Sequence, residues 1–109
     1  MFGSHVKMDS PVSFRESLTA YLAMSTFDKL VEKLLRGDND ASFSFSDLCY
    51  ILRSIGFDET IKGSHHIFSR SGIEEQLNLQ TWQGSRHAKP YQLRQVRNLL
   101  LKYDLGRER

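Results

Sequence analysis

The feature that most constrains the fold is a change in the spacing of apolar residues at Gly56. Before this glycine, apolar residues recur at intervals of three and four, as they do along one face of an α-helix. After it come two short runs, residues 57–62 and 65–70, joined by Gly63 and Ser64. A two-residue connection that begins with glycine favours a type II′ β-hairpin. The pattern therefore predicts helices first and a β-sheet second.

Capping residues and further apolar patterns define the remaining elements. Ser46 is the predicted N-cap of the third helix, with Phe45 packing onto Tyr50. Pro90 suits the first position of the last helix. The expected helices span about residues 14–24, 27–35, 47–55 and 90–103, and an expected third strand, with alternating apolar residues, spans residues 76–80.

This element order predicts an α+β two-layer sandwich. A three-stranded antiparallel sheet carries helices on one face, in the order α-β-β-β-α, with one or two extra N-terminal helices. The other face of the sheet is left open to solvent or a partner. We expect a disordered leader or a remnant of an expression tag at residues 1–12, a helical extension at 13–45 and the core domain at 46–106.

Composition narrows the class of protein. Hydrophobic residues make up 39% and charged residues 26% of the chain, a balance typical of a globular domain. No apolar run approaches the roughly 18 residues that span a bilayer, and the N-terminus lacks a secretory signal, so we expect a cytoplasmic protein. The single cysteine, Cys49, cannot form an internal disulfide and has no neighbouring cysteine for a zinc site. We therefore expect neither a metal nor a cofactor.

The basic residues are unevenly distributed, although the net charge is only +2. Residues 80–103 contain no Asp or Glu. A cationic segment of this kind attracts phosphates or an acidic protein, although a solvated helix face would have the same pattern. The basic residues of this segment are Arg86, Lys89, Arg94, Arg97 and Lys102.

The adjacent histidines His65 and His66 are the best candidates for chemistry. On a strand they point to opposite faces, and a one-residue change in hairpin register would exchange them. Histidine titrates near neutrality, and Ser64 adds a hydroxyl and an amide for a phosphate oxygen. This set suits cleavage of RNA, whose 2′-hydroxyl supplies the nucleophile, but two ordinary polar strand residues remain the alternative. Metal binding is disfavoured because no Cys or paired acid joins them in the sequence.

Several of these residues together resemble one family. The signature of the HicA family of messenger-RNA-cleaving toxins resembles two segments of this chain. These are Gly56-Phe57 and Ile61-Lys62-Gly63-Ser64-His65-His66-Ile67-Phe68. The segment from Lys89-Pro90-Tyr91 to Leu100 is similar to the last helix of that family, and Tyr103-Asp104-Leu105-Gly106 to its C-terminus. The resemblance covers roughly residues 46–106. A Pro-His-Pro-like segment of many members is replaced here by residues 80–87.

The resemblance implies a fold like the double-stranded RNA-binding domain and a metal-independent endoribonuclease acting in the stress response of a toxin–antitoxin system. It implies His65 as the catalytic residue, Gly63 and Ser64 as the turn, and a HicB-like antitoxin as partner. On the basis of charge alone, we also expect Lys62, Arg94 and Arg97 to contact the phosphates of RNA. His66 would then be the neighbour of the catalytic His65 in the substrate-binding site. A non-catalytic RNA-binding domain or a protein-interaction domain is the alternative. The oligomeric state stays open.

Overall fold

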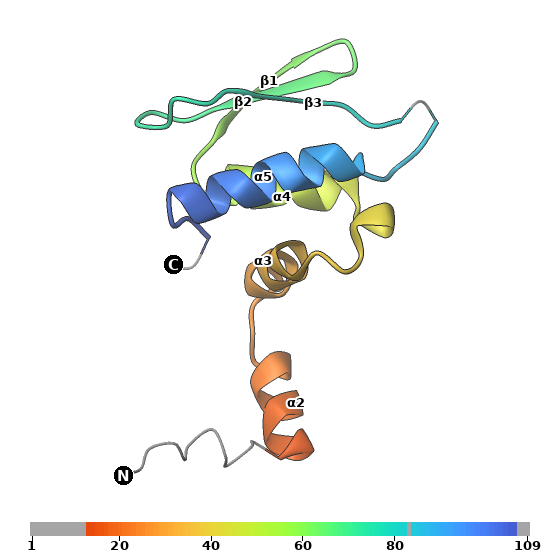
Figure 1. Ribbon diagram of the computed structural model, residues 1–109, viewed down its shortest axis with the longest axis vertical. Coiled ribbons are helices and arrows are strands. Elements are labelled where there is room, and N and C mark those ends of the chain that lie inside the picture. The colour runs from red at the N-terminus through yellow and green to blue at the C-terminus, as the bar shows by residue number, and fades with distance from the viewer. Residues whose placement is uncertain (1–12, 83, 107–109) are drawn as a thin grey trace.

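The computed structural model describes residues 13–82 and 84–106, so the expected leader at residues 1–12 lies outside the described residues. The chain has the predicted α+β fold, with helices packed on one face of an antiparallel meander of order β1-β2-β3 (Figure 1). In chain order the elements are α2 (Phe14–Leu22), α3 (Thr26–Arg36), the 3-10 helix η2 (Asp40–Ser42), α4 (Phe45–Ser54), β1 (Asp58–Lys62), β2 (His65–Ser69), β3 (Leu77–Leu79) and α5 (Pro90–Lys102). No helix in the described part of the chain is both long and apolar enough to cross a membrane.

The core lies between the sheet and the layer formed by α4 and α5 (Figure 1). Phe68 in β2 and Leu77 and Leu79 in β3 have no exposed surface. Because side chains alternate along a strand, these three residues define the face of the sheet that is turned toward the helices. The residues of α4 and α5 that cover them are Leu48, Ile51, Leu52, Leu93, Val96 and Leu100.

The start of α4 differs from the prediction. The N-cap is Ser44 and not Ser46, and its hydroxyl accepts a hydrogen bond from the Asp47 amide at 3.3 Å. Phe45 is therefore the first residue of the helix and not the residue before its cap, so the predicted packing of a pre-cap Phe45 onto Tyr50 is wrong, and Phe45 is buried in the core while Tyr50 is exposed. The cause is a long-range pairing, because the Phe45 amide donates to the carbonyl of Arg86 at 2.9 Å and draws this turn into the core.

The loop after β3 is held by a buried polar side chain. Gln92 in α5 is only 1% exposed. With its side-chain amide oriented to satisfy both groups, Gln92 donates from its NH₂ group to the backbone carbonyl of Gln80 at 3.0 Å. Its amide oxygen accepts from the backbone N–H of Gln80 at 3.1 Å. The side chain thus satisfies both backbone groups of the residue that follows β3, as a neighbouring strand would. This contact ties the beginning of α5 to the end of the sheet.

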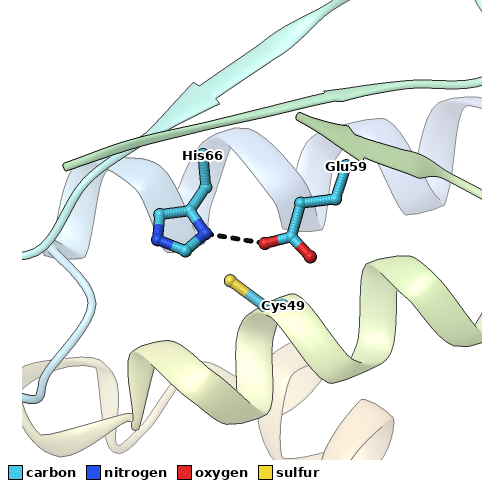
Figure 2. A group of neighbouring side chains, drawn as sticks. All are labelled: Cys49, Glu59 and His66. Carbon is cyan, nitrogen blue, oxygen red and sulfur yellow. Dashed lines mark hydrogen bonds and ion pairs between the residues drawn. The ribbon is translucent and has the colours of Figure 1, made fainter. Parts of the chain in front are cut away.

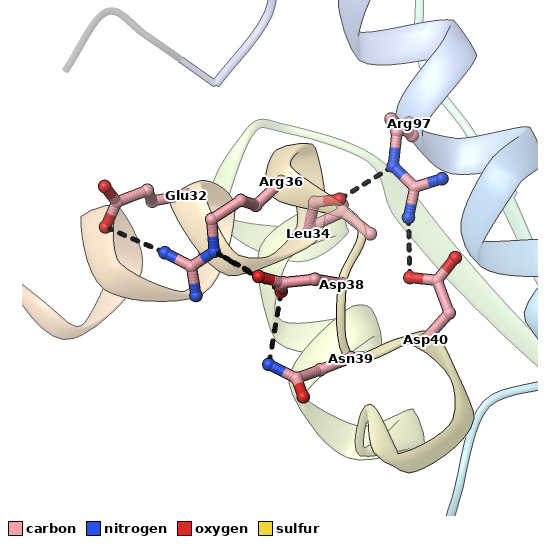
Figure 3. A network of polar contacts seen from close by, with 7 residues as sticks. All are labelled: Glu32, Leu34, Arg36, Asp38, Asn39, Asp40 and Arg97. Carbon is pink, nitrogen blue, oxygen red and sulfur yellow. Dashed lines mark hydrogen bonds and ion pairs between the residues drawn. The ribbon is translucent and has the colours of Figure 1, made fainter.

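A polar clasp joins α3 and η2 to α5, centred on Arg97 (Figure 3). The Arg97 guanidinium donates to the Leu34 carbonyl and to the Asp40 carboxylate, both at 2.7 Å. It also lies close above Gly37, which ends α3 with a left-handed φ of 75°. Any side chain at that position would meet the guanidinium at 3.2 Å as well as the strain of a positive φ. Together with buried Phe27, Val31 and Leu34, the clasp makes α3 part of the folded body.

The first helix, α2, stands apart from this body (Figure 1). A capping box begins this helix, since the Ser13 hydroxyl accepts from the Glu16 amide and the Glu16 carboxylate accepts from the Ser13 amide. None of its residues is buried. Phe14 is 80% exposed and Leu22 is 64% exposed. An apolar helix face is therefore presented to solvent.

Arg97→Met is expected to lower the free energy of unfolding by about 1–3 kcal/mol, because the half-buried Asp40 carboxylate and the Leu34 carbonyl lose their donor. Arg94→Met is the matched control, since Arg94 is an exposed arginine of the same helix, and it should stay within about 0.5 kcal/mol of the wild type. Urea unfolding followed by circular dichroism measures both. Equal losses in the two variants would contradict the clasp.

The C-terminal end of α5 generates a pH-dependent prediction. The Glu75 carboxylate accepts hydrogen bonds from Lys102 at 2.7 Å and from the Tyr103 hydroxyl at 2.6 Å, and these hold its pKa down at about 2. Because the pKa of Glu75 is lower in the folded state than its ordinary value of 4.5, the ionised carboxylate stabilises the folded state fully at a pH above 4.5. This stabilisation is lost as the pH falls toward 2. Glu75→Gln should therefore melt at a lower temperature than the wild type at pH 7, and the difference should shrink on acidification.

The exposed neighbour Glu74 provides the control for this measurement, since Glu74→Gln removes the same charge without touching Lys102 or Tyr103. Thermal melts of both variants between pH 7 and pH 3 separate the local contact from a change in net charge. An identical pH profile for the two variants would refute the role of Glu75.

Candidate functional site

The β1–β2 hairpin presents the predicted Gly-Ser-His turn at its tip. Lys62 pairs with His65 across the two strands, which leaves Gly63 and Ser64 as the two-residue connection. Gly63 has a φ of 62°, while Ser64 does not have a positive φ. Only the first turn residue is left-handed, as a type II′ turn requires. A β-carbon at Gly63 would meet nothing within 4 Å, so glycine is favoured there by backbone conformation and not by space.

The register of the hairpin assigns the two histidines to opposite faces. Phe68 faces the helices, so His66, two residues earlier on the same strand, faces them too. His66 is half-buried, and the centre of its ring lies 4.9 Å from that of Phe45. His65 points to the other side and is exposed. The described helices all lie on one side of the sheet, so His65 is on the uncovered face (Figure 1).

His65 is oriented by a residue that sequence reasoning overlooked. Its Nδ1 atom lies 2.9 Å from Oδ1 of Asn78 in β3. An amide oxygen can only accept, so the Nδ1–H of a neutral His65 donates to it. This leaves Nε2 with a free lone pair, as an acceptor of protons. Strand alternation is the signal that could have found Asn78, because it lies between two core leucines and must share the face of His65.

Other polar groups surround His65 at this corner of the sheet. Lys62 is its exposed cross-strand neighbour, and such pairs share one face of the sheet. The Ser64 hydroxyl accepts a hydrogen bond from Gln80 at 2.7 Å, which links the hairpin tip to the end of β3. A concavity of about 430 Å³ lies beside the tip, lined by Ser64, Gln80, Thr81 and Gly84. We call Lys62, Ser64, His65, Asn78 and Gln80 the hairpin-tip site.

The predicted arginines do not join this site. Arg97 donates to Asp40 and Leu34 in the clasp and so has a structural role in the helix layer, while its predicted contact with phosphate stays a prediction. Arg94 is exposed, but it belongs to α5 in the helix layer on the other side of the sheet from the face of His65 (Figure 1). His66 is likewise turned away from His65. Among the predicted cations, Lys62 alone shares the face of His65.

The helix-facing side of the sheet holds a second cluster of reactive groups. Cys49 from α4, Glu59 from β1 and His66 from β2 point toward one another (Figure 2), and one ligand atom from each lies within 4.8 Å of the others. Nδ1 of His66 is 2.6 Å from Oε2 of Glu59, and Arg53 donates to Oε1 of Glu59 at 2.9 Å. The sequence argument that neither a cysteine nor an acid joins the histidines is therefore wrong. Residues distant in sequence meet here only through packing.

The electrostatics of this cluster oppose a nucleophilic thiol. Cys49 is 3% exposed, and burial, aided by the negative charge of Glu59, raises its pKa to about 12. Burial also acts to raise the pKa of Glu59, but hydrogen bonds from His66 and Arg53 outweigh it and hold that pKa below its ordinary value. A cysteine nucleophile needs access and a lowered pKa, and Cys49 has neither. Glu59 is thus an ionised acceptor between two donors.

A concavity of about 520 Å³ lies at the beginning of α4 and includes none of the residues of the hairpin-tip site. His87, an exposed loop residue, lines it and forms a backbone bridge with Ser44. The other lining residues are Ser42, Phe45, Ser46, Thr81 and Arg86. No buried polar side chain of the described residues lacks a partner, so no unpaired group here indicates a ligand.

Comparison of the chain with models of known families, with curated proteins and with solved structures finds no match.

The contact between His65 and Asn78 predicts a tautomer. In wild-type protein at a pH where His65 is neutral, its proton should be on Nδ1. Asn78→Ala should shift the ring toward the Nε2–H form, because the acceptor for Nδ1–H is removed. Long-range ¹H–¹⁵N correlation spectra of the histidine rings distinguish the two forms, with His87 as an internal control. Unchanged nitrogen shifts at His65 would refute the orienting role of Asn78.

Proposed function

We propose that this protein is a toxin-type endoribonuclease that cleaves messenger RNA in the cytoplasm, with His65 as the acid–base residue. The observation that carries the proposal is an exposed histidine whose Nδ1 atom is engaged by Asn78, which leaves Nε2 as the ring nitrogen that can accept a proton. An imidazole held in this way is suited to proton transfer at neutral pH. The resemblance of the Gly63-Ser64-His65 turn and its flanking segments to HicA toxins supports the same assignment.

The proposed reaction uses the 2′-hydroxyl of RNA as the nucleophile. Nε2 of His65 accepts the proton of that hydroxyl while its oxygen attacks the adjacent phosphorus. The bond from phosphorus to the 5′-oxygen breaks, which leaves a 2′,3′-cyclic phosphate, and the 5′-oxygen takes up a proton from the imidazolium or from water. In this proposal Lys62, the cross-strand neighbour of His65, and the Ser64 amide stabilise the charge that develops on the phosphate oxygens. The reaction is balanced with no group beyond RNA and water.

A protein-interaction role is the second candidate, and α2 favours it. This helix leaves Phe14 and Leu22 largely exposed and buries none of its residues. An exposed apolar face of this kind marks a site of protein contact. In a toxin it would be a contact for a HicB-like antitoxin, whereas in a protein without ribonuclease activity it would be the main functional surface.

His65→Ala should reduce RNA cleavage by about 10²–10⁴-fold, the usual contribution of a general acid–base group. His87→Ala, which removes another exposed histidine, should cleave as the wild type does. The assay uses purified full-length chain and a labelled messenger RNA, and it identifies the 2′,3′-cyclic phosphate end. An RNA with 2′-deoxy substitutions should resist cleavage.

Two results would overturn the ribonuclease proposal. The first is intact RNA in the presence of folded wild-type protein, and the second is equal activity of the His65→Ala and wild-type proteins. In either case, fluorescence anisotropy with the same RNA tests the non-catalytic binding alternative. Growth arrest on induced expression of wild type but not of His65→Ala would support the toxin role.

A further inference from the structure

The cluster of Cys49, Glu59 and His66 lies where α4 meets the first two strands. Glu59 and His66 are on adjacent strands and face the helices, while Cys49 rises from α4 toward them (Figure 2). Each residue therefore comes from a different element. The three side chains offer a thiol sulfur, a carboxylate oxygen and an imidazole nitrogen, which are the three ligand types that zinc takes from proteins.

We propose that this cluster is a zinc site in which Cys49 Sγ, Glu59 Oε2 and a ring nitrogen of His66 hold one Zn²⁺ ion. In a tetrahedral zinc site the ligand atoms are about 3.3–3.8 Å apart, given bonds of about 2.0–2.3 Å. The three ligand atoms already lie within 4.8 Å of one another, and the nitrogen and oxygen lie 2.6 Å apart. Coordination of zinc would replace the hydrogen bond between His66 and Glu59, and the nitrogen and oxygen would move apart to the distance of two zinc ligands.

Two of the three ligands can carry the negative charge that binds a divalent cation, namely the Cys49 thiolate and the Glu59 carboxylate. On binding, the thiol proton is released to solvent, and Zn²⁺ is then neutralised by one thiolate and one carboxylate, with a neutral imidazole. Arg53 holds the other oxygen of Glu59 at 2.9 Å, so it orients the carboxylate without occupying Oε2. The side chains of His66 and Glu59 are 25% and 14% exposed, so water can reach the fourth coordination position. A soft thiolate beside an imidazole selects zinc or a similar transition metal over magnesium or calcium.

Zinc at this place would fasten α4 to β1 and β2. The two strands carry the hairpin whose tip presents His65, but the metal and His65 are on opposite faces of the sheet. The zinc site therefore goes beyond the proposed ribonuclease function and does not depend on it. The ion would act as a structural clamp, and its removal should loosen the contact between helix and sheet.

Titration of metal-free, full-length protein with zinc sulfate is the first test. Calorimetry should give one Zn²⁺ per chain, and the melting temperature should rise with zinc concentration. Cobalt(II) serves as a spectroscopic probe, because tetrahedral coordination gives strong visible bands and a bound thiolate gives a charge-transfer band in the near ultraviolet. Cys49 is the one cysteine of the chain, so that band identifies Cys49 as the ligand.

Cys49→Ala should abolish the charge-transfer band and weaken zinc binding by at least about 100-fold, which exceeds the usual 10–100-fold effect of losing a supporting contact. Glu59→Gln should also weaken binding, and it keeps the cysteine and the shape of the side chain. His87→Ala is the control and should bind zinc as the wild type does. Circular dichroism of each metal-free variant checks that it is folded.

Three outcomes would overturn the zinc site. They are the absence of zinc binding by folded wild-type protein, unchanged binding by Cys49→Ala and Glu59→Gln, and a stoichiometry of one metal to two chains. None of them affects the RNA-cleavage assay, because that assay depends on His65 on the other face.

Discussion

The burial of Phe68, Leu77 and Leu79 against α4 and α5 is the constraint on which the rest of this structure depends. Removing a buried side chain of this size from a core costs about 3–5 kcal/mol, a large part of the stability of a small domain. Because side chains alternate along a strand, the requirement that Phe68 face the helices also determines where its neighbours point. A hairpin register shifted by one residue would expose Phe68 and is therefore excluded.

This register gives the two adjacent histidines different surroundings. His65 is turned to the uncovered face, where Asn78 engages one ring nitrogen and leaves the other available for proton transfer. His66 is turned toward the helices, where Glu59 and the buried thiol of Cys49 lie next to it. The two faces of β2 thus separate the solvent-facing histidine of the proposed RNA cleavage from the inward-facing residues of the proposed zinc site. Apolar packing, and not the histidines themselves, makes this division.

The N-terminal helices are attached to this core to different degrees. Buried apolar residues and the Arg97 clasp hold α3, and Gly37 allows the guanidinium to pass closely over the end of that helix. In the described part of the chain, α2 buries none of its residues, and its printed contact with α3 is the Lys29 ammonium 4.8 Å from the centre of the Tyr21 ring. Arg97 also illustrates why a count of basic residues is a poor guide to a nucleic-acid surface. Its charge is already used inside the fold, and Lys62 is left as the cation beside His65.

The sequence by itself determined the element order, the hairpin at Gly63 and Ser64, the end of α3 at Gly37 and the start of α5 at Pro90, because apolar period, turn residues and caps are local signals. It also determined that His65 and His66 face opposite ways. Only the tertiary structure decided which of them faces outward, that α4 begins after Ser44, and that Arg97 is structural. The meeting of Cys49, Glu59 and His66 also appeared only there. These outcomes depend on contacts between residues far apart in the chain, which local patterns do not encode.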